Sequence, residues 1–346
     1  MGDLEIPYIN PITKERMEEL HNLISPGPVL VVTHDNPDPD ALSSGKALAF
    51  LFKDAWGVSS RLFYSGIVAR AENKAMLRIL TPEWEHMDTI DDLDRFSAIV
   101  MVDTQPGAGN NRFPTDHRLN VVIDHHHPIR QDLDQISFVD IRPEIGATVS
   151  IVFQYLETMN LVPDTDLATA IFYGVRTDTR ALSRDSSPAD QFAYFKLLSV
   201  LDHNKLAQVE QAGLPRDYFK AFSKGLLSTK VYKKVIVTYQ GEVHRPDFSA
   251  EMSDLLIRHE DTVAVLCMGF HENVLYMSMR TSTDDLDAGL LIQNLVPASA
   301  KAGGHGKSAG GQVPLGNQTA EIVAAEIEKR FLEVMGEEES WQPLLV

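Results

Sequence analysis

The sequence is poor in cysteine, in basic residues and in long apolar runs, and each scarcity excludes a class of protein. A single cysteine, Cys267, rules out a disulfide within the chain, and the apolar run TVAVLCMGF around it predicts a buried thiol. No apolar stretch approaches the length that crosses a bilayer, so we expect no membrane-spanning helix. The first residues, MGDLEIPYINPITKERM, lack the apolar core of a secretory signal, and we expect a cytoplasmic location.

Basic side chains are outnumbered by acidic ones. The 31 Lys and Arg residues against 49 Asp and Glu residues give a formal net charge of −18. This balance argues against a protein that binds long duplex DNA, because such binding depends on the neutralisation of many phosphates. Small phosphorylated ligands are compatible with it, since a few cations or bound metal ions can hold them. Divalent ions bound by carboxylates would offset part of the acidic surplus.

The chain of 346 residues is long enough for two domains, each with its own core. In the first half, strands that are apolar along their whole length alternate with helical patterns, which is typical of a parallel sheet covered on both faces. The predicted fold class is α/β, with an N-terminal mainly parallel sheet flanked by helices and a smaller C-terminal α+β domain. We predict the first domain over residues 1–203, a helical linker over 204–227 and the second domain over 228–346.

Acidic and histidine side chains recur where the strands of the first domain are predicted to end. They form four groups: His34, Asp38 and Asp40 after PVLVVT; Asp103 closing SAIVMVD; Asp124, His125 and His126 closing NVVIDHH; and Asp178 in GVRTDT. One such residue alone is most often a helix cap or a turn residue, and Asp40 fits an N-cap. Capping needs only one side-chain oxygen, however, and it explains neither the histidines nor the repeated acids.

The carboxyl ends of parallel strands meet at one edge of a sheet, where ligands bind in such folds. Several carboxylates gathered there would repel one another without a counterion. A pair of divalent cations removes that cost, and carboxylate with imidazole suits Mn, Zn or Fe better than Ca. Asp38 and Asp40 occupy alternate positions, which point the same way in an extended segment. Pro37 and Pro39 would hold that segment extended, so we predict a preformed ligand arm.

These motifs resemble the DHH phosphoesterase family, named for the Asp-His-His that stands here at residues 124–126. The four family motifs occur in order as THDNPDPDALSSG, VMVDTQP, VVIDHHH and FYGVRTDT. In addition, GGHGKSAGG at 303–311, preceded by SMRTS at 278–282, resembles the family's C-terminal nucleotide-handling domain. The likeness covers nearly the whole chain. The length and the short linker are most similar to the RecJ-like nanoRNase and pAp-phosphatase group, which degrades very short oligoribonucleotides and adenosine bisphosphate.

The resemblance implies a role for each of these residues. It assigns one Mn ion to His34, Asp38 and Asp103. It assigns a second Mn ion to Asp40, Asp103, His125 and Asp178, so that Asp103 bridges the two. His126 would face the scissile phosphate, and Asp124 would orient a histidine ligand from behind. In the C-terminal domain, the positions that would hold the substrate are Arg280, Ser282, Gly303, Gly304 and His305.

The sequence also departs from the family pattern at four positions. Ser43 stands where family members usually carry Gly, and Arg180 replaces a frequent Gly after the fourth motif. His127 is an additional histidine, and Ala302 occupies a position where a further Gly is common. None of these changes removes a predicted metal ligand. Arg180 and Ala302 bear on substrate preference, because both would lie near the cleft.

The main hypothesis is Mn-dependent, two-metal hydrolysis of short oligonucleotides or of adenosine 3′,5′-bisphosphate, with other divalent transition metals as alternatives. A cyclic- or linear-dinucleotide phosphodiesterase shares this metal centre and stays open. A RecJ-like single-strand exonuclease is disfavoured by the acidic charge and the compact length, since it would need a longer basic or aromatic groove. The family's pyrophosphatases lack the GGH loop. A nucleotide-sensing protein without activity is the alternative from another class.

The partners expected on these grounds are short single-stranded oligonucleotides or small phosphorylated nucleotides, and neither duplex DNA nor a membrane. The sequence does not set the oligomeric state, although homodimers are the commonest soluble assemblies.

Overall fold

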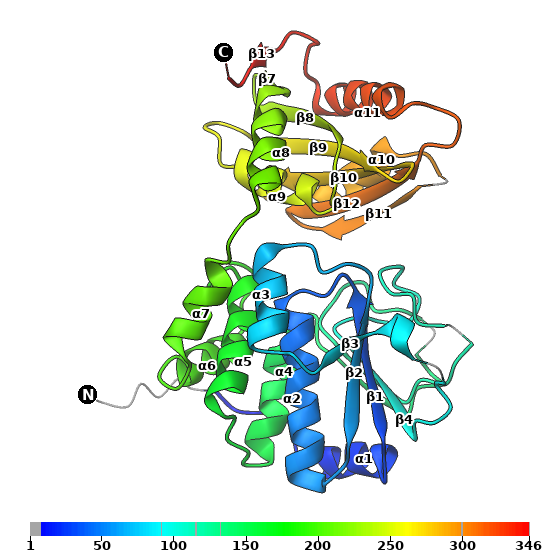
Figure 1. Ribbon diagram of the computed structural model, residues 1–346, viewed down its shortest axis with the longest axis vertical. Coiled ribbons are helices and arrows are strands. Elements are labelled where there is room, and N and C mark those ends of the chain that lie inside the picture. The colour runs from blue at the N-terminus through cyan, green and yellow to red at the C-terminus, as the bar shows by residue number, and fades with distance from the viewer. Residues whose placement is uncertain (1–7, 91, 115, 132, 299, 346) are drawn as a thin grey trace. The chain divides into compact units, whose positions relative to one another are not determined.

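The computed structural model describes residues 8–90, 92–114, 116–131, 133–298 and 300–345 (Figure 1). The chain divides into two compact units, residues 1–212 and 213–346. Helices α7 (His203–Glu210) and α8 (Arg216–Leu227) cover most of residues 204–227, which were expected as a helical linker, and the division falls between these helices. Among the described residues, no helix is both long and apolar enough to span a membrane.

The first unit is built on a six-stranded parallel sheet with the strand order β3-β2-β1-β4-β5-β6. Its strands are β1 (Val29–Asp35), β2 (Ser60–Ser65), β3 (Trp84–His86), β4 (Ala98–Val102), β5 (Val121–Asp124) and β6 (Phe138–Ile141). Every residue of β4 and β5 is buried, as expected for strands covered on both faces. The strand order reverses between β1 and β4, and ligands bind at the carboxyl ends of the strands at such a switch point. The parallel α/β prediction is confirmed.

The two faces of this sheet pack against different hydrophobic cores. Val29 and Val31 belong to the larger core, together with buried residues of the helices, whereas Leu30 and Val32 belong to a smaller core. This alternation follows from the two-residue period of a strand. The remaining helical elements of the unit are α1 (Lys14–Ile24), α2 (Pro39–Trp56), α3 (Ala71–Ile79), the short 3-10 helix η1 (Met87–Thr89), α4 (Thr148–Thr158), α5 (Thr165–Asp178) and α6 (Pro188–Leu197).

Helices α2 and α5 approach each other closely because glycine lies at their contact. A Cβ atom on Gly174 of α5 would stand 2.3 Å from the Ser43 hydroxyl oxygen of α2. That hydroxyl donates a hydrogen bond to the Pro39 carbonyl at 2.7 Å. Ser43, one of the departures from the family pattern, is therefore accommodated by a glycine on the facing helix.

The second unit is built on a seven-stranded sheet with the strand order β11-β12-β10-β9-β8-β7-β13. Its strands are β7 (Thr229–Tyr232), β8 (Val235–Glu242), β9 (Ala264–His271), β10 (Val274–Thr281), β11 (Lys301–His305), β12 (Ser308–Pro314) and β13 (Gln342–Pro343). Strands β8 and β9 pair in parallel and the other neighbours are antiparallel, so the sheet is mixed, and together with its helices it agrees with the predicted α+β domain. Helices α10 (Ala288–Leu295) and α11 (Ala320–Met335) contribute to one core, and α8 and α9 (Phe248–Leu256) to the other.

Two local predictions for the second unit are confirmed. The polar stretch HEN between the apolar runs TVAVLCMGF and NVLYMSMRTS predicts a hairpin turn, and strands β9 and β10 form that hairpin. Glu272 and Asn273 have φ values of 45° and 65°, as a two-residue hairpin turn requires. Cys267 is completely buried in β9. The glycine-rich segment AGGHGKSAGGQV, by contrast, was expected as a loop, and this expectation is wrong: the segment lies in strands β11 and β12, which pair from Lys301 with Gln312 to His305 with Ser308.

Candidate metal centre

Side chains from all four predicted groups meet at the carboxyl edge of the parallel sheet. His34 lies at the end of β1, Asp38 and Asp40 at the start of α2, and Asp103 directly after β4. The remaining members are His125 and His126 directly after β5 and Asp178 in the last turn of α5. Asp103 has a φ of 60°, in the left-handed region that a non-glycine residue rarely occupies.

One set of ligand atoms consists of His34, Asp38 and Asp103, whose donor atoms all lie within 4.8 Å of one another. His34 Nε2 is 3.4 Å from Asp103 Oδ2 and 3.9 Å from Asp38 Oδ1. Asp38 also caps α2, because its Oδ1 accepts a hydrogen bond from the Ala41 amide at 3.1 Å. The N-cap that the sequence suggested at Asp40 thus belongs to Asp38, with Pro39 in the first helical position, where proline is favoured.

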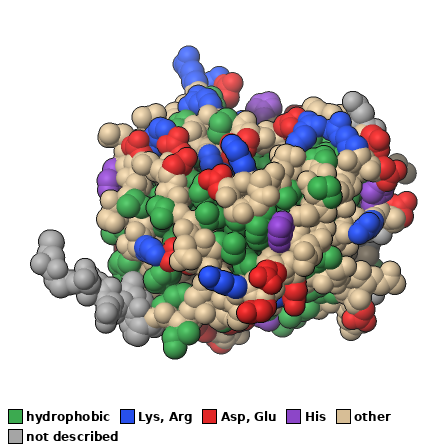
Figure 2. All heavy atoms as spheres, turned by 90° about the horizontal axis from the view of Figure 1, so that it is seen from below, with side chains coloured by type: hydrophobic (Ala, Val, Ile, Leu, Met, Phe, Trp, Pro, Cys, Tyr) green, Lys and Arg blue, Asp and Glu red, His purple; other side chains and the backbone are tan. Residues whose placement is uncertain are grey.

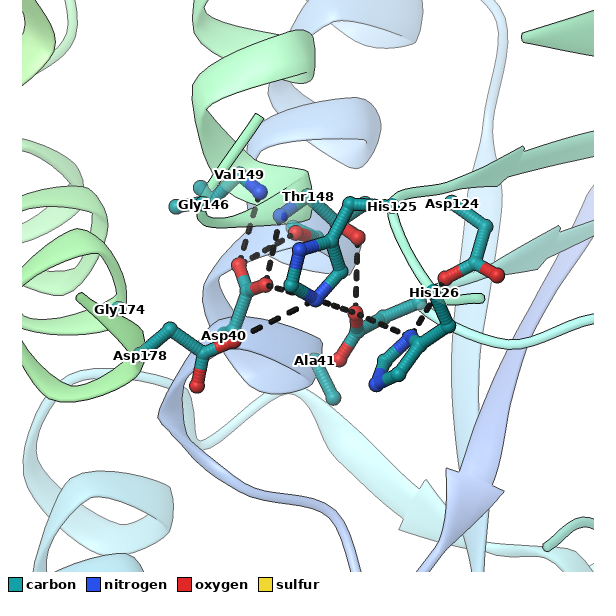
Figure 3. Close-up of polar contacts among 12 residues, drawn as sticks. Asp40, Ala41, Asp124, His125, His126, Gly146, Thr148, Val149, Gly174 and Asp178 are labelled. Atoms are coloured by element: carbon teal, nitrogen blue, oxygen red, sulfur yellow. Dashed lines mark hydrogen bonds and ion pairs between the residues drawn. The ribbon is translucent and has the colours of Figure 1, made fainter. Parts of the chain in front are cut away.

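A second set of ligand atoms consists of Asp40, His125 and Asp178, again within 4.8 Å of one another. Figure 3 shows these three side chains pointing toward one another. His125 Nε2 is 3.4 Å from Asp178 Oδ2, 3.9 Å from Asp40 Oδ2 and 3.7 Å from Asp103 Oδ1. Asp103 therefore presents Oδ2 to the first set and Oδ1 to the second, as a carboxylate shared by two ions would.

The two histidines are oriented through their Nδ1 atoms. His34 Nδ1 lies 2.9 Å from the Asp35 carbonyl oxygen, and His125 Nδ1 lies 3.0 Å from the Ile145 carbonyl oxygen. A carbonyl only accepts hydrogen bonds, so Nδ1 carries the proton in both rings, and in a neutral ring the lone pair of Nε2, on the side of the carboxylates, is available to a metal ion. His125 Nε2 is buried and has no hydrogen-bond partner among the described residues. A buried ring nitrogen without a partner, facing three carboxylates, fits a metal ion.

Asp40 is held by groups from a distant part of the chain. It is completely buried, and its two oxygens accept hydrogen bonds from the backbone amides of Thr148 (2.6 Å) and Val149 (2.8 Å), the first residues of α4. The Thr148 hydroxyl donates to Asp103 Oδ1 at 2.8 Å. Sequence reasoning missed Thr148, although it stands in the small-residue stretch GATVS that opens this helix.

Asp124 contacts His126 rather than a ligand of the two sets. Its Oδ1 lies 2.8 Å from His126 Nδ1, and its Oδ2 accepts a hydrogen bond from Gln105 at 2.7 Å. The same Gln105 amide donates to the His126 carbonyl at 2.9 Å. Gln105 is a second residue that sequence reasoning missed, two positions after Asp103 in the motif VMVDTQP. It fixes the Asp124–His126 pair in place.

Burial and neighbouring charges raise the pKa values of two carboxyl groups in the cluster. Burial, together with the negative charges of Asp103, Asp178 and Asp38, raises the pKa of Asp40 well above its usual value. Burial likewise raises the pKa of Asp178, with the charges of Asp38 and Asp103 next in importance. Divalent ions bound here would favour the ionised form of both carboxyl groups.

The histidines and Asp103 shift one another's pKa values as well. Burial alone would lower the pKa of His34 and of His126, but hydrogen bonds to Asp103 and to Asp124 outweigh it and raise the pKa of His34 to about 9 and that of His126 to about 10. Burial would raise the pKa of Asp103, but the hydrogen bond from His34 and the charges of the three histidines lower it to about 2.

The predicted substrate residues of the second unit have structural contacts of their own. Arg280 is 12% exposed, with Nε bound to Asp254 Oδ1 at 2.7 Å. The Ser282 hydroxyl donates to the Thr262 carbonyl at 2.8 Å. Gly304 has a φ of 148°, and a Cβ there would stand 2.4 Å from the Ser308 carbonyl oxygen, whereas Gly303 faces open space. The side chain of His305 lies outside the described residues. The binding roles of these residues stay predictions.

Comparison with known proteins agrees with this organisation. Residues 28–175 match the DHH family N-terminal domain, and residues 232–332 match the DHHA1 domain. An uncharacterized protein of Methanocaldococcus jannaschii is 32% identical over 319 residues, which cover 89% of this chain and 64% of the relative. A probable manganese-dependent inorganic pyrophosphatase of Streptococcus agalactiae is 23% identical over 173 residues, or 50% of this chain and 55% of the relative. The chain thus spans less than two thirds of the length of either relative.

A solved structure shares the fold over nearly the full chain. The crystal structure of an exopolyphosphatase-related protein from Bacteroides fragilis superposes with a TM-score of 0.78 at 16% sequence identity. The match covers 95% of this chain and 99% of that one.

Proposed function

The chain belongs to the DHH family of phosphoesterases and carries a DHHA1 domain, and from this premise we propose that it hydrolyses phosphoester bonds with a pair of divalent metal ions. The observation that carries the proposal is the placement of Asp103, whose two oxygens face two separate sets of ligand atoms. The first ion would be held by His34, Asp38 and Asp103. The second would be held by Asp40, Asp103, His125 and Asp178.

Manganese is the ion we propose for both positions. Mixed carboxylate and imidazole ligands suit such an ion, and the Streptococcus relative is named as manganese-dependent. Bound divalent ions supply two functions to such a reaction, since they lower the pKa of a water molecule and neutralise charge on the phosphoryl oxygens. The protein would hold the carboxylates in fixed positions, so that they do not have to rearrange during the reaction.

His126 is the residue we propose to contact the scissile phosphate. Its side chain is 38% exposed, so a substrate can reach it, whereas the Asp103 side chain is only 1% exposed. Asp124 occupies Nδ1, which leaves Nε2 for the substrate. Gln105 holds Asp124 and the His126 backbone at once, so the imidazole is fixed before a substrate arrives.

For the substrate, we propose short oligonucleotides or adenosine 3′,5′-bisphosphate. Support comes from the motif order and length described above and from the net charge of −18, which is unsuited to long duplexes. On the face drawn in Figure 2, Lys and Arg side chains stand among Asp and Glu side chains rather than in one basic field. The names of the relatives favour a second candidate, the hydrolysis of pyrophosphate or polyphosphate.

The second unit is proposed to hold the substrate through Arg280, Ser282, Gly303, Gly304 and His305. Arg280 Nε and Nη1 are engaged by Asp254, the Ser278 hydroxyl and the Met279 carbonyl. These contacts fix the guanidinium plane and leave Nη2 for a phosphate oxygen.

The test is a panel of substrates with the full chain in the presence of manganese. We expect hydrolysis of adenosine bisphosphate or of short RNA and DNA strands to exceed that of cyclic dinucleotides, pyrophosphate and polyphosphate. Asp103→Ala should abolish turnover and most of the metal binding, because one carboxylate serves both ion positions. Manganese-stimulated hydrolysis of none of these substrates would contradict the proposal and favour a nucleotide-sensing protein. Faster hydrolysis of pyrophosphate or polyphosphate would favour the second candidate.

A further inference from the structure

We propose that Asp190, on helix α6, is a positioning residue for the metal centre, although it lies outside all four motifs. It would act through the turn formed by residues 145–149, which contacts several of the proposed ligands. This inference rests on the proposed function, because it concerns the affinity of that centre for its metal ions.

Four hydrogen bonds join the 145–149 turn to the centre. The Ile145 carbonyl orients His125, and the Thr148 and Val149 amides hold the two oxygens of Asp40. The fourth is donated by the Thr148 hydroxyl to Asp103. Figure 3 shows Gly146, Thr148 and Val149 beside Asp40. A shift of this turn would therefore move two ligands of the second set, His125 and Asp40, together with Asp103, which both sets share.

The turn has little support from its own helix. Ala147, the N-cap residue of α4, provides no side-chain hydrogen bond to the first turn of that helix. The amides that a cap would satisfy are directed at Asp40 instead. The position of the turn has to be set by groups outside α4.

The Asp190 carboxylate supplies that support from both sides of the turn. Its Oδ2 accepts a hydrogen bond from the Gly146 amide at 2.8 Å, before the turn enters α4. Its Oδ1 accepts one from the Ser150 hydroxyl at 2.6 Å, one residue after Val149. Asp190 is completely buried, and Ser187 completes its environment with an amide at 2.7 Å and a hydroxyl at 2.6 Å. A buried carboxylate with this many donors has little freedom to move.

Close packing at Gly146 ties the same turn to the segment that follows Asp178. A Cβ atom on Gly146 would stand 2.7 Å from the Asp185 carbonyl oxygen, 2.8 Å from Thr179 Cγ2 and 3.0 Å from Asp190 Oδ2. Thr179 directly follows Asp178 in the sequence. Asp190 thus binds the turn at Gly146, where the turn packs against the segment that follows Asp178, another proposed ligand. Partners that orient metal ligands typically change metal affinity 10- to 100-fold when removed.

Two serines allow a matched test, because each gives the Asp190 carboxylate one hydroxyl at 2.6 Å. Ser150 lies on the metal side of the carboxylate, whereas Ser187 is the N-cap of α6. In the full chain, Ser150→Ala should weaken Mn²⁺ binding about tenfold. Ser187→Ala should lower the melting temperature, as the loss of a cap does, with Mn²⁺ affinity within about twofold of wild type. Free Mn²⁺ is measured by electron paramagnetic resonance during a titration, and folding by thermal unfolding.

Two substitutions of Asp190 itself complete the test. Asp190→Ala should weaken Mn²⁺ binding about 10- to 100-fold. Asp190→Asn should restore most of the affinity, because the amide oxygen can accept from Gly146 and the amide nitrogen can donate to the Ser150 hydroxyl. If Asp190→Ala does not fold, the comparison of Ser150→Ala with Ser187→Ala tests the inference.

Two results would overturn the inference. One is wild-type Mn²⁺ affinity in folded Ser150→Ala or Asp190→Ala. The other is an equal loss of affinity in Ser150→Ala and Ser187→Ala, since that would reflect general stability. A wild-type chain that binds no Mn²⁺ would contradict both the proposed function and this inference. If the wild type binds Mn²⁺ and the folded variants bind it equally well, only the inference is contradicted.

Discussion

Asp38 and Asp40 are two positions apart in the sequence, but their surroundings show what a sequence can and cannot reveal. Asp38 caps the helix that follows it, and its side chain is 41% exposed. That role is local, and Pro39 at the first helical position signals it. Asp40 is buried against amides that lie more than one hundred residues further along the chain. Such a partner has no local signal, and the same is true of Thr148, Gln105 and Asp190.

Substitution of Arg280 tests the predicted role of the second unit. Arg280→Ala should raise the Michaelis constant for short nucleotides about tenfold or more, because a charge-assisted contact to phosphate would be lost. The manganese content should not change, since all proposed metal ligands lie in the first unit. Steady-state kinetics and metal analysis of the same samples measure both. If the Michaelis constant stayed unchanged for every substrate hydrolysed, Arg280 would have no part in substrate binding, and its role would be limited to contacts within the second unit.

The reactivity of Cys267 provides a test with a defined pH dependence. Burial raises the pKa of the Cys267 thiol to about 12, above its ordinary value of 9.0. The neutral thiol therefore stabilises the folded state fully below pH 9, and this contribution is lost as the pH rises toward 12. We expect iodoacetamide to leave the native protein unmodified at pH 8 and to label it at pH 8 in denaturant. Rapid labelling of the native chain at pH 8 would contradict the burial of β9.

At the scale of elements, the sequence predicted those strands and helices whose patterns are long enough to read. Strands β1, β4 and β5 are apolar runs, and the hairpin between β9 and β10 follows from a polar turn between two such runs. Strand β3 has only three residues, too few to show a period. Helix α1 was missed although its sequence KERMEELHNLI places buried Met17, Leu20 and Ile24 at helical spacing after the Thr13 cap.

The close contact of α2 with α5 leads to a stability prediction. Gly174→Ala should lower the free energy of unfolding by about 1–3 kcal/mol, because the added methyl group overlaps the Ser43 hydroxyl. Urea denaturation followed by tryptophan fluorescence measures the change. Gly213→Ala is a suitable control, because a Cβ there meets nothing within 4 Å. The double variant with Ser43→Gly should recover most of the loss, and no recovery would show that the two residues do not oppose each other.

At the scale of the whole molecule, each unit has its own sheet and its own cores. The length of the chain predicted two domains, the second of them a smaller α+β domain. All proposed metal ligands belong to residues 1–212, whereas the predicted substrate residues belong to residues 213–346. Metal binding by the first unit and substrate binding by the second would therefore be separable by experiment.

A fragment of residues 1–212 should accordingly fold and bind manganese with the affinity of the full chain. Its activity on short nucleotides should fall mainly through a higher Michaelis constant, because the second unit no longer contributes to substrate binding. Circular dichroism, a manganese titration and steady-state kinetics measure the three properties. A folded fragment without metal affinity would show that the centre depends on the second unit.

The central claim is that the centre holds two ions that share Asp103, and the manganese content of the protein tests it most directly. After equilibrium dialysis of the full chain against Mn²⁺, elemental analysis should give about two ions per chain for wild type. Asp103→Ala should retain fewer than one, while Arg280→Ala should retain the wild-type content. A wild-type content of one ion or none, or an Asp103→Ala variant that still binds two, would contradict the account.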